Sequence, residues 1–125
     1  ISFDKKFKKS IIFKSMGSKI YHSFLSSSDL VVGNSSSGII EAPSLGVPTL
    51  NVGDRQKGRI FAKSVSHCVN KKSVIIRNLR KILFRRKKIN FKNPYYKKNT
   101  SKIIFKNIKK ILKQKHKSKA FYDIS

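Results

Sequence analysis

Apolar residues along this chain fall into short continuous runs that alternate with longer stretches of helical spacing. The short runs have the length of buried strands, and Gly, Pro, Asn or Ser residues bound them. They are residues 10–14, 29–33, 48–52 and 65–69. Helical spacing predicts helices over residues 18–26, 71–84 and roughly 100–114. Strands that alternate with helices indicate a Rossmann-like α/β fold, a parallel sheet with helices on both faces.

A further helix is predicted over residues 35–45, where a serine cluster supplies N-cap residues. Pro43 lies inside this segment and cannot donate a backbone hydrogen bond, so the helix should be short or kinked. In the last helix we expect one apolar face to be buried, namely Ile104, Ile108, Ile111 and Leu112. The helix over residues 71–84 also has one apolar face, namely Ile75, Leu79, Ile82 and Leu83.

The length of 125 residues is that of a single domain. We expect residues 1–114 to form this domain and residues 115–125 to be a basic tail. The domain should be incomplete at its amino-terminal side, because the chain begins at Ile1 rather than Met. Ligands of a parallel sheet bind beyond the carboxyl ends of its strands. The loops after Gly33 and Val52 are therefore the expected place for a site.

Basic residues dominate the composition: 30 Lys and Arg stand against 5 Asp and Glu, which gives a net charge of +25. Such a chain binds polyanions non-specifically, so a basic nucleic-acid-binding module is an alternative function. Residues 20–54 contain no Lys or Arg, however, and aromatic residues lie beside basic ones mainly at Tyr95 and Tyr96. The pattern favours compositional drift at solvated positions, and we expect no nucleic-acid partner.

The remaining composition excludes several kinds of site. Cys68 is the only cysteine, which rules out an intrachain disulfide. Cys68 and the three histidines lack metal-ligand spacing, so we expect no metal and no cofactor. No apolar run is long enough to span a bilayer, and the first ten residues do not have the pattern of a signal peptide. The expected location is the cytoplasm, without a membrane partner.

The run G-N-S-S-S-G-I-I-E-A-P, from Gly33 to Pro43, has the features of a phosphate site. Backbone N–H groups at the start of a helix point outward with the positive end of the helix dipole. The hydroxyls of Ser35, Ser36 and Ser37 can add donors, and Gly38 would let a diphosphate approach the backbone closely. On these residues alone, an N-cap with spare hydroxyls is the simpler alternative.

Glu41 and Arg55 extend the predicted site from phosphate to nucleotide. A carboxylate one turn along the helix suits the paired hydroxyls of a ribose, although Glu41 as an ordinary surface carboxylate is the alternative. Arg55 follows the neighbouring strand in V-G-D-R-Q-K-G-R and can clamp phosphate oxygens, while Lys57 and Arg59 either assist or face solvent. Neither the dinucleotide G-x-G-x-x-G motif, the P-loop nor a nucleophile elbow is present.

The segment from Ser28 to Arg59 closely resembles the signature of hydrolysing UDP-N-acetylglucosamine 2-epimerases. It has the sequence S-D-L-V-V-G-N-S-S-S-G-I-I-E-A-P-S-L-G-V-P-T-L-N-V-G-D-R-Q-K-G-R. The serine turn and the G-D-R-Q-K-G-R loop distinguish it from the non-hydrolysing epimerases. The same loop disfavours a further alternative, the carboxy-terminal domain of a GT-B glycosyltransferase. Family members usually carry glycine and an acid after the late N-P-Y, where this chain has Tyr96, Lys97 and Lys98.

The resemblance implies the carboxy-terminal half of a two-domain, GT-B-like enzyme whose active site lies between its domains. It implies that Ser35 and Ser36 bind the diphosphate, Glu41 holds the ribose and Arg55 contacts phosphate. Family members eliminate UDP from UDP-N-acetylglucosamine and add water, which releases N-acetylmannosamine or a related 2-epimer for sialic-acid-type sugar synthesis.

The acids and bases of this family reaction come largely from the other domain, so no catalytic residue is expected here and the fragment should be inactive alone. The implied partners are the UDP-sugar substrate and the missing amino-terminal domain. A homo-oligomer is an open alternative.

Overall fold

A computed structural model describes residues 10–84 and 91–113 of the chain. The chain divides into two units, one that ends at Tyr95 and one that begins at Tyr96. The first unit contains the sheet and the helices around it, and the second contains α5. Residues 115–125, for which a basic tail is predicted, lie outside the described residues.

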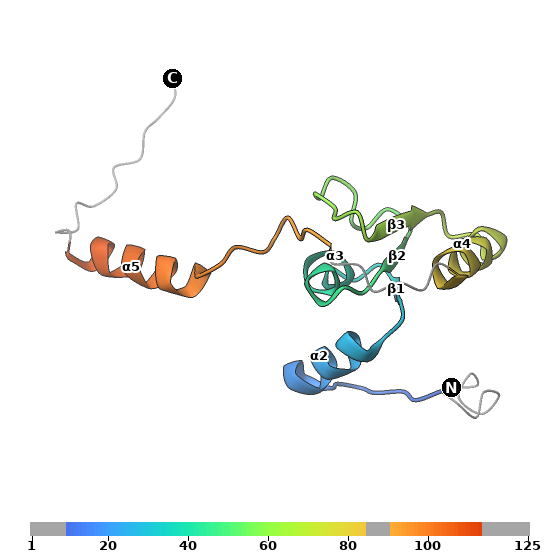
Figure 1. Ribbon diagram of the computed structural model, residues 1–125, viewed down its shortest axis with the longest axis horizontal. Helices are drawn as coiled ribbons and strands as arrows, with labels where there is room; N and C mark the ends of the chain where they lie inside the picture. The colour runs from blue at the N-terminus through green and yellow to red at the C-terminus, as the bar shows by residue number, and fades with distance from the viewer. Residues whose placement is uncertain (1–9, 85–90, 114–125) are drawn as a thin grey trace, which may run out of the picture. The chain divides into compact units, whose positions relative to one another are not determined.

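The first unit is built on a parallel sheet of three described strands (Figure 1). β1 (Val31–Gly33) pairs with β2 (Thr49–Val52), and β2 pairs with β3 (Val65–Cys68). Gly33, the last residue of β1, pairs with Asn51 near the end of β2. The loops after β1 and β2 therefore leave the sheet beside each other at its carboxyl edge, as the sequence predicts.

The segment between β1 and β2 forms two short helices instead of one continuous helix. α3 (Ser37–Ile40) is followed by the 3-10 helix η1 (Ala42–Leu45). Pro43 in η1 has no N–H to donate, which interrupts the α-helical hydrogen bonds at this point. Gly46 then ends the segment at φ 70°, a left-handed conformation that favours glycine. The prediction of a short or kinked helix is confirmed.

The core of the first unit lies where α2, α3 and η1 meet the sheet. α2 (Gly17–Ser27) contributes Leu25, which packs with Ala42 and Val47. Ile39 of α3 and Leu50 of β2 are completely buried. Because α3 contacts both β1 and β2, this core holds the serine turn against the carboxyl edge of the sheet.

α4 (Lys72–Phe84) lies on the side of the sheet opposite α3, where it contacts β2 and β3 (Figure 1). Three of its predicted apolar-face residues, Ile75, Leu79 and Ile82, are partly buried. Leu83, predicted on the same face, is 39% exposed. Helices thus cover both faces of a parallel sheet, and the predicted Rossmann-like α/β class is confirmed.

The predicted strand over residues 10–14 is wrong. These residues have no regular secondary structure, and the side chains of Ile11, Ile12 and Phe13 are exposed. A strand needs a neighbour for its backbone hydrogen bonds, and no described strand pairs with this segment. Phe13 instead packs edge-on against Phe24 of α2, with ring centroids 5.6 Å apart.

The second unit contains α5 (Thr100–Lys113), which has the predicted position but not the predicted burial. Every residue of α5 is exposed, including all four of its predicted core residues, Ile104, Ile108, Ile111 and Leu112. Their spacing does produce one apolar face. Burial also requires a surface to pack against, and the described part of this unit contains no second helix or strand.

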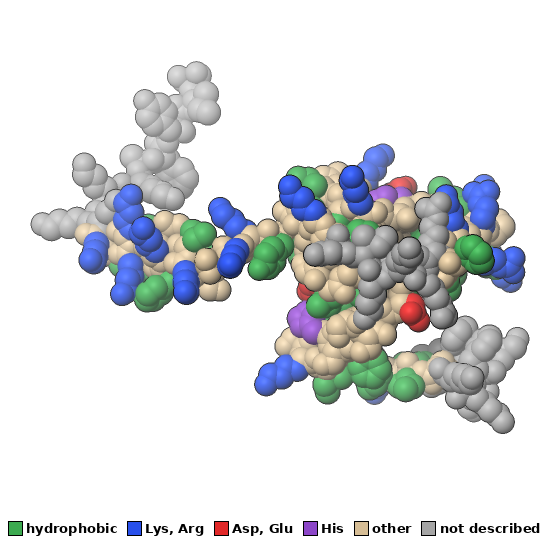
Figure 2. Space-filling view, in the orientation of Figure 1, with side chains coloured by type: hydrophobic (Ala, Val, Ile, Leu, Met, Phe, Trp, Pro, Cys, Tyr) green, Lys and Arg blue, Asp and Glu red, His purple; other side chains and the backbone are tan. Residues whose placement is uncertain are grey.

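All described Lys and Arg residues lie at exposed positions. Figure 2 shows them scattered over the first unit and crowded on α5. Exposed lysines keep their hydration and need no partner, so this placement agrees with drift at solvated positions. Among the helices described, none combines the length and the apolar character needed to cross a membrane.

Candidate functional site

One buried side chain joins the two loops at the carboxyl edge of the sheet. Gln56, in the loop after β2, is 4% exposed, and its Nε2 donates a 2.7 Å hydrogen bond to the carbonyl of Asn34 in the loop after β1. Its Oε1 is buried with no hydrogen-bond partner in the described structure. The G-D-R-Q-K-G-R loop is thereby held against the serine turn. Arg55 directly precedes this anchor in the sequence.

Ser35 and Ser36 present their hydroxyls at the exposed turn between β1 and α3. Ser35 Oγ accepts a 3.3 Å hydrogen bond from the N–H of Ser37, and its own O–H stays free to donate. Ser36 is the N-cap residue of α3, but its side chain makes no capping hydrogen bond. Both hydroxyls can therefore donate to a ligand. Because α3 has only four residues, its dipole adds less than a long helix would.

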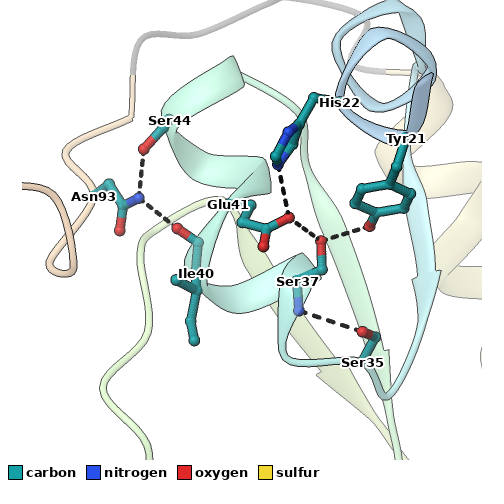
Figure 3. Close-up of polar contacts among 8 residues, drawn as sticks. All are labelled: Tyr21, His22, Ser35, Ser37, Ile40, Glu41, Ser44 and Asn93. Atoms are coloured by element: carbon teal, nitrogen blue, oxygen red, sulfur yellow. Dashed lines mark hydrogen bonds and ion pairs between the residues drawn. The ribbon is translucent and has the colours of Figure 1, made fainter. Parts of the chain in front are cut away.

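Ser37 and Glu41 belong to a chain of polar contacts that includes two residues of α2 (Figure 3). Ser37 Oγ donates to Oε2 of Glu41 over 2.8 Å, and the Tyr21 hydroxyl is hydrogen-bonded to Ser37 Oγ. His22 Nε2 lies 3.3 Å from the same Glu41 oxygen. The Glu41 side chain is 41% exposed, and no described residue bonds its Oε1. This carboxylate is held through one oxygen and open through the other.

From the sequence we expected Gly38 to allow a diphosphate close to the backbone. In the structure, packing against β2 explains why this residue is glycine. A Cβ atom at this position would lie 2.7 Å from Cγ2 of Thr49, and the Thr49 hydroxyl donates a 2.7 Å hydrogen bond to the Gly38 carbonyl. Glycine is therefore required by the close packing of α3 on β2. This contact fixes the start of α3, and so the position of the serine turn, relative to the sheet.

Arg55 is exposed and makes no hydrogen bond or ion pair with any described residue. The same holds for the side chains of Lys57 and Arg59, which follow in the same loop. A free guanidinium next to a buried anchor suits the binding of an external anion, since no internal carboxylate competes for it. Of these three cations, Arg55 and Lys57 directly flank Gln56 in the sequence.

Two contributions to this region are not apparent from the sequence pattern. Gln56 stands in a conspicuous loop motif, but its amide looks like any polar loop residue until its burial is known. Asn93, in the late N-P-Y run, donates to the carbonyl of Ile40 over 2.7 Å and to Ser44 Oγ over 2.6 Å (Figure 3). Asn93 thus ties the late loop to α3 and η1, opposite the serine turn.

A pocket of about 730 Å³ opens between α4 and the loop after β2, and its lining includes Lys57, Phe61, His67 and Asn78. None of the six predicted nucleotide-binding residues lines it. His67 is held there by a 3.2 Å contact of its Nδ1 with Asn51 Nδ2 and by the Phe61 ring, 4.2 Å away. Within the described residues, no three His, Cys, Asp or Glu side chains gather as metal ligands would.

Comparison with known proteins gives one consistent relationship. The family model of UDP-N-acetylglucosamine 2-epimerase matches residues 2–109 of this chain. Polysialic acid biosynthesis protein P7 of Escherichia coli is 42% identical over 115 residues, which are 88% of this chain and 29% of that protein.

Two shorter matches have informative names. GDP/UDP-N,N'-diacetylbacillosamine 2-epimerase (hydrolyzing) of Campylobacter jejuni is 42% identical over 57 residues, 46% of this chain and 15% of that protein. UDP-N-acetylglucosamine 2-epimerase of Neisseria meningitidis is 44% identical over 59 residues, 47% of this chain and 16% of that protein. This chain spans less than a third of the length of each of these relatives.

The family match runs from before α2 into α5, and it includes the serine turn, Glu41 and the loop that Gln56 anchors. The E. coli relative extends the similarity over most of the chain. The chain therefore belongs to the UDP-N-acetylglucosamine 2-epimerase family.

Proposed function

We propose that this chain is the UDP-binding part of a hydrolysing UDP-N-acetylglucosamine 2-epimerase. The whole enzyme would convert UDP-N-acetylglucosamine, or a related UDP-2-acetamido sugar, to UDP and a free 2-epimer such as N-acetylmannosamine. The observation that carries the proposal is the Gln56–Asn34 hydrogen bond, because it brings the arginine-bearing loop to the serine turn. The name of the Campylobacter jejuni relative, a hydrolysing 2-epimerase, supports the reaction type.

In this proposal the nucleotide lies along the carboxyl edge of β1 and β2. The free hydroxyls of Ser35 and Ser36 donate to the diphosphate, and Arg55 neutralises it from the adjacent loop. Glu41 accepts hydrogen bonds from the ribose through Oε1, the carboxylate oxygen left open. The site then combines donors for an anion with one acceptor for hydroxyl groups, which is the chemistry of a nucleoside diphosphate.

The proposal assigns nucleotide binding to this chain and proton transfer to residues outside it. The only acids among the described residues are Asp29, Glu41 and Asp54, and Glu41 already has the ribose role. The 125-residue chain should therefore bind UDP without turning over UDP-N-acetylglucosamine. The amino-terminal domain of the same enzyme is the partner that would supply the missing acids and bases.

The test is UDP binding by isothermal titration calorimetry with the chain and three variants. Glu41→Gln and Arg55→Ala should each weaken UDP binding by about tenfold, the effect of losing one hydrogen bond to a charged group. Lys81→Ala removes an exposed charge of α4, outside the two loops, and should leave the affinity unchanged. UDP affinity equal to wild type in both Glu41→Gln and Arg55→Ala would contradict the assigned site.

A further inference from the structure

The Ser37 hydroxyl has a single proton to donate, and the contacts around it show where that proton goes. Ser37 Oγ lies 2.8 Å from Oε2 of Glu41, and an ionised carboxylate can only accept hydrogen bonds. Ser37 is therefore the donor in this contact. The Tyr21 hydroxyl, bonded to the same Ser37 oxygen, must then donate to Ser37. With its proton directed to Glu41, Ser37 has none to offer a phosphate oxygen.

We infer that Ser37 is a positioning residue for Glu41 rather than a ligand of the diphosphate. This role depends on the proposed function, in which Glu41 binds the ribose. Ser37 and His22 both approach Oε2, so the carboxylate is oriented with Oε1 left for the ribose hydroxyls (Figure 3). Within the serine triplet, Ser35 and Ser36 are then the two hydroxyl donors to phosphate.

The polar chain is anchored to the core through α2. Leu25 of α2 is 4% exposed, and Tyr21, one turn earlier, packs partly buried against the same apolar cluster. The Tyr21 phenol therefore reaches Ser37 from a fixed position. Glu41, by contrast, is 41% exposed and has several rotatable bonds. Without the Ser37 hydrogen bond, ordering the Glu41 side chain would have to occur at the expense of ribose binding.

Comparing a ribonucleotide with its deoxy counterpart separates a ribose role from a phosphate role. UDP and 2′-deoxy-UDP carry the same diphosphate, so their affinity ratio reports contacts to the 2′-hydroxyl alone. In the 125-residue chain, wild type should prefer UDP by about tenfold, the effect of one hydrogen bond to a carboxylate. A residue that acts only on phosphate should change both affinities and leave their ratio as it is.

The experiment is calorimetric titration of both nucleotides into wild type, Ser37→Ala and the matched control Ser36→Ala. Ser37→Ala should reduce the preference for UDP to about threefold or less, with a smaller loss for 2′-deoxy-UDP, which keeps only the 3′-hydroxyl, than for UDP. Ser36→Ala should weaken both nucleotides by the same factor. Tyr21→Phe, which keeps the ring and removes the hydroxyl, should lower the preference in the same direction as Ser37→Ala and by less.

Equal weakening of both nucleotides in Ser37→Ala would overturn the positioning role and make Ser37 a phosphate ligand. If circular dichroism shows that Ser37→Ala does not fold, an unchanged preference in Tyr21→Phe overturns it instead. A wild-type chain that binds neither nucleotide is a different failure, because it refutes the proposed function and removes the ribose role of Glu41 with it.

Discussion

Individual atoms decide how closely α3 approaches the sheet. The contact between Gly38 and Thr49 combines a 2.7 Å hydrogen bond with a space too small for one more methyl group. A single hydrogen bond likewise distinguishes Ser37 from Ser35 and Ser36. Ser37 donates its hydroxyl proton to Glu41. The serine triplet therefore contains two residues whose hydroxyls can donate to a ligand and one whose hydroxyl donates to Glu41.

Replacing Gly38 by alanine tests the close contact with β2. The new Cβ would lie 2.7 Å from Thr49 Cγ2, so Gly38→Ala should lower the free energy of unfolding by about 1–3 kcal/mol. Thr49→Ser removes that methyl group and keeps the hydroxyl. Urea denaturation should therefore show a smaller cost of Gly38→Ala in the Thr49→Ser background. Equal costs in both backgrounds would mean that another contact is responsible.

Between elements, single side-chain amides make the connections that apolar packing does not. Gln56 joins the two loops at the carboxyl edge, and Asn93 joins the late loop to α3 and η1. Gln56 donates one hydrogen bond, to a backbone carbonyl, and Asn93 donates two, to a backbone carbonyl and to a serine hydroxyl. Substitutions that remove the amide donor at Gln56 or Asn93, or replace it by a charged group, should loosen the loops while the strands remain paired.

Gln56→Glu replaces the donor to Asn34 by a carboxylate oxygen of the same shape. A buried carboxylate facing a carbonyl should reduce the free energy of unfolding by about 2–3 kcal/mol. Gln56→Met has a similar length, and it also removes the unpaired Oε1, so its cost should be smaller. Urea denaturation at neutral pH distinguishes the two variants. Wild-type stability in Gln56→Glu would show that the loops are held by other contacts.

Asn93→Ala removes two hydrogen bonds at once, to the Ile40 carbonyl and to Ser44 Oγ. The partly exposed location of Asn93 limits the expected loss to about 1–2 kcal/mol of unfolding free energy. Asn70→Ala serves as the control, because Asn70 is exposed and its side chain makes no hydrogen bond within the described residues. Thermal denaturation measures the effect. Equal midpoints for the two variants would show that Asn93 does not hold the late loop to α3 and η1.

The sequence was sufficient for elements whose pattern is local. The helix over residues 71–84, the broken helix at Pro43 and the strands around Val32, Leu50 and Ser66 all follow from spacing and from proline chemistry. Pairing and burial depend on distant partners. The apolar run at residues 10–14 has no described strand beside it, and the described part of the second unit holds no other element to cover the apolar face of α5, so both expectations were wrong.

The same division holds for the site. Neighbouring loops after parallel strands could be predicted, and with them the candidate residues Ser35, Ser36, Glu41 and Arg55. The contacts of Tyr21 and His22 with Ser37 and Glu41 could not, because they depend on how α2 packs against η1. The role of Gln56 could not be predicted either, because only its burial in the folded chain distinguishes it from other polar loop residues.

For the whole molecule, the net charge of +25 attracts anions over the entire surface, whereas the proposed nucleotide site depends on a few residues. Exposed cations at every described Lys and Arg position attract any polyanion, through a sum of weak, screened contacts. The proposed UDP site instead needs Glu41, one of only 5 acidic residues. Non-specific attraction and nucleotide binding should therefore respond to different substitutions.

Labelled duplex DNA and UDP provide this comparison. DNA affinity, measured by fluorescence anisotropy, should fall by about tenfold or more from low to physiological salt. Replacing Lys106, Lys109 and Lys110 of α5 by glutamine should weaken DNA binding and leave UDP binding intact. Glu41→Gln should do the reverse. Loss of UDP binding in the α5 variant alone would favour the basic-module alternative for the function.

The strand register has a consequence for how the sheet can be assembled. Val31 pairs with Thr49, and Thr49 pairs with Val65, so each strand finds its neighbour one crossover further along the chain. Because both crossovers are short, the entropic cost of closing each loop is low. During synthesis, β1 and β2 can associate as soon as β2 has left the ribosome, and β3 then adds to the free edge of β2.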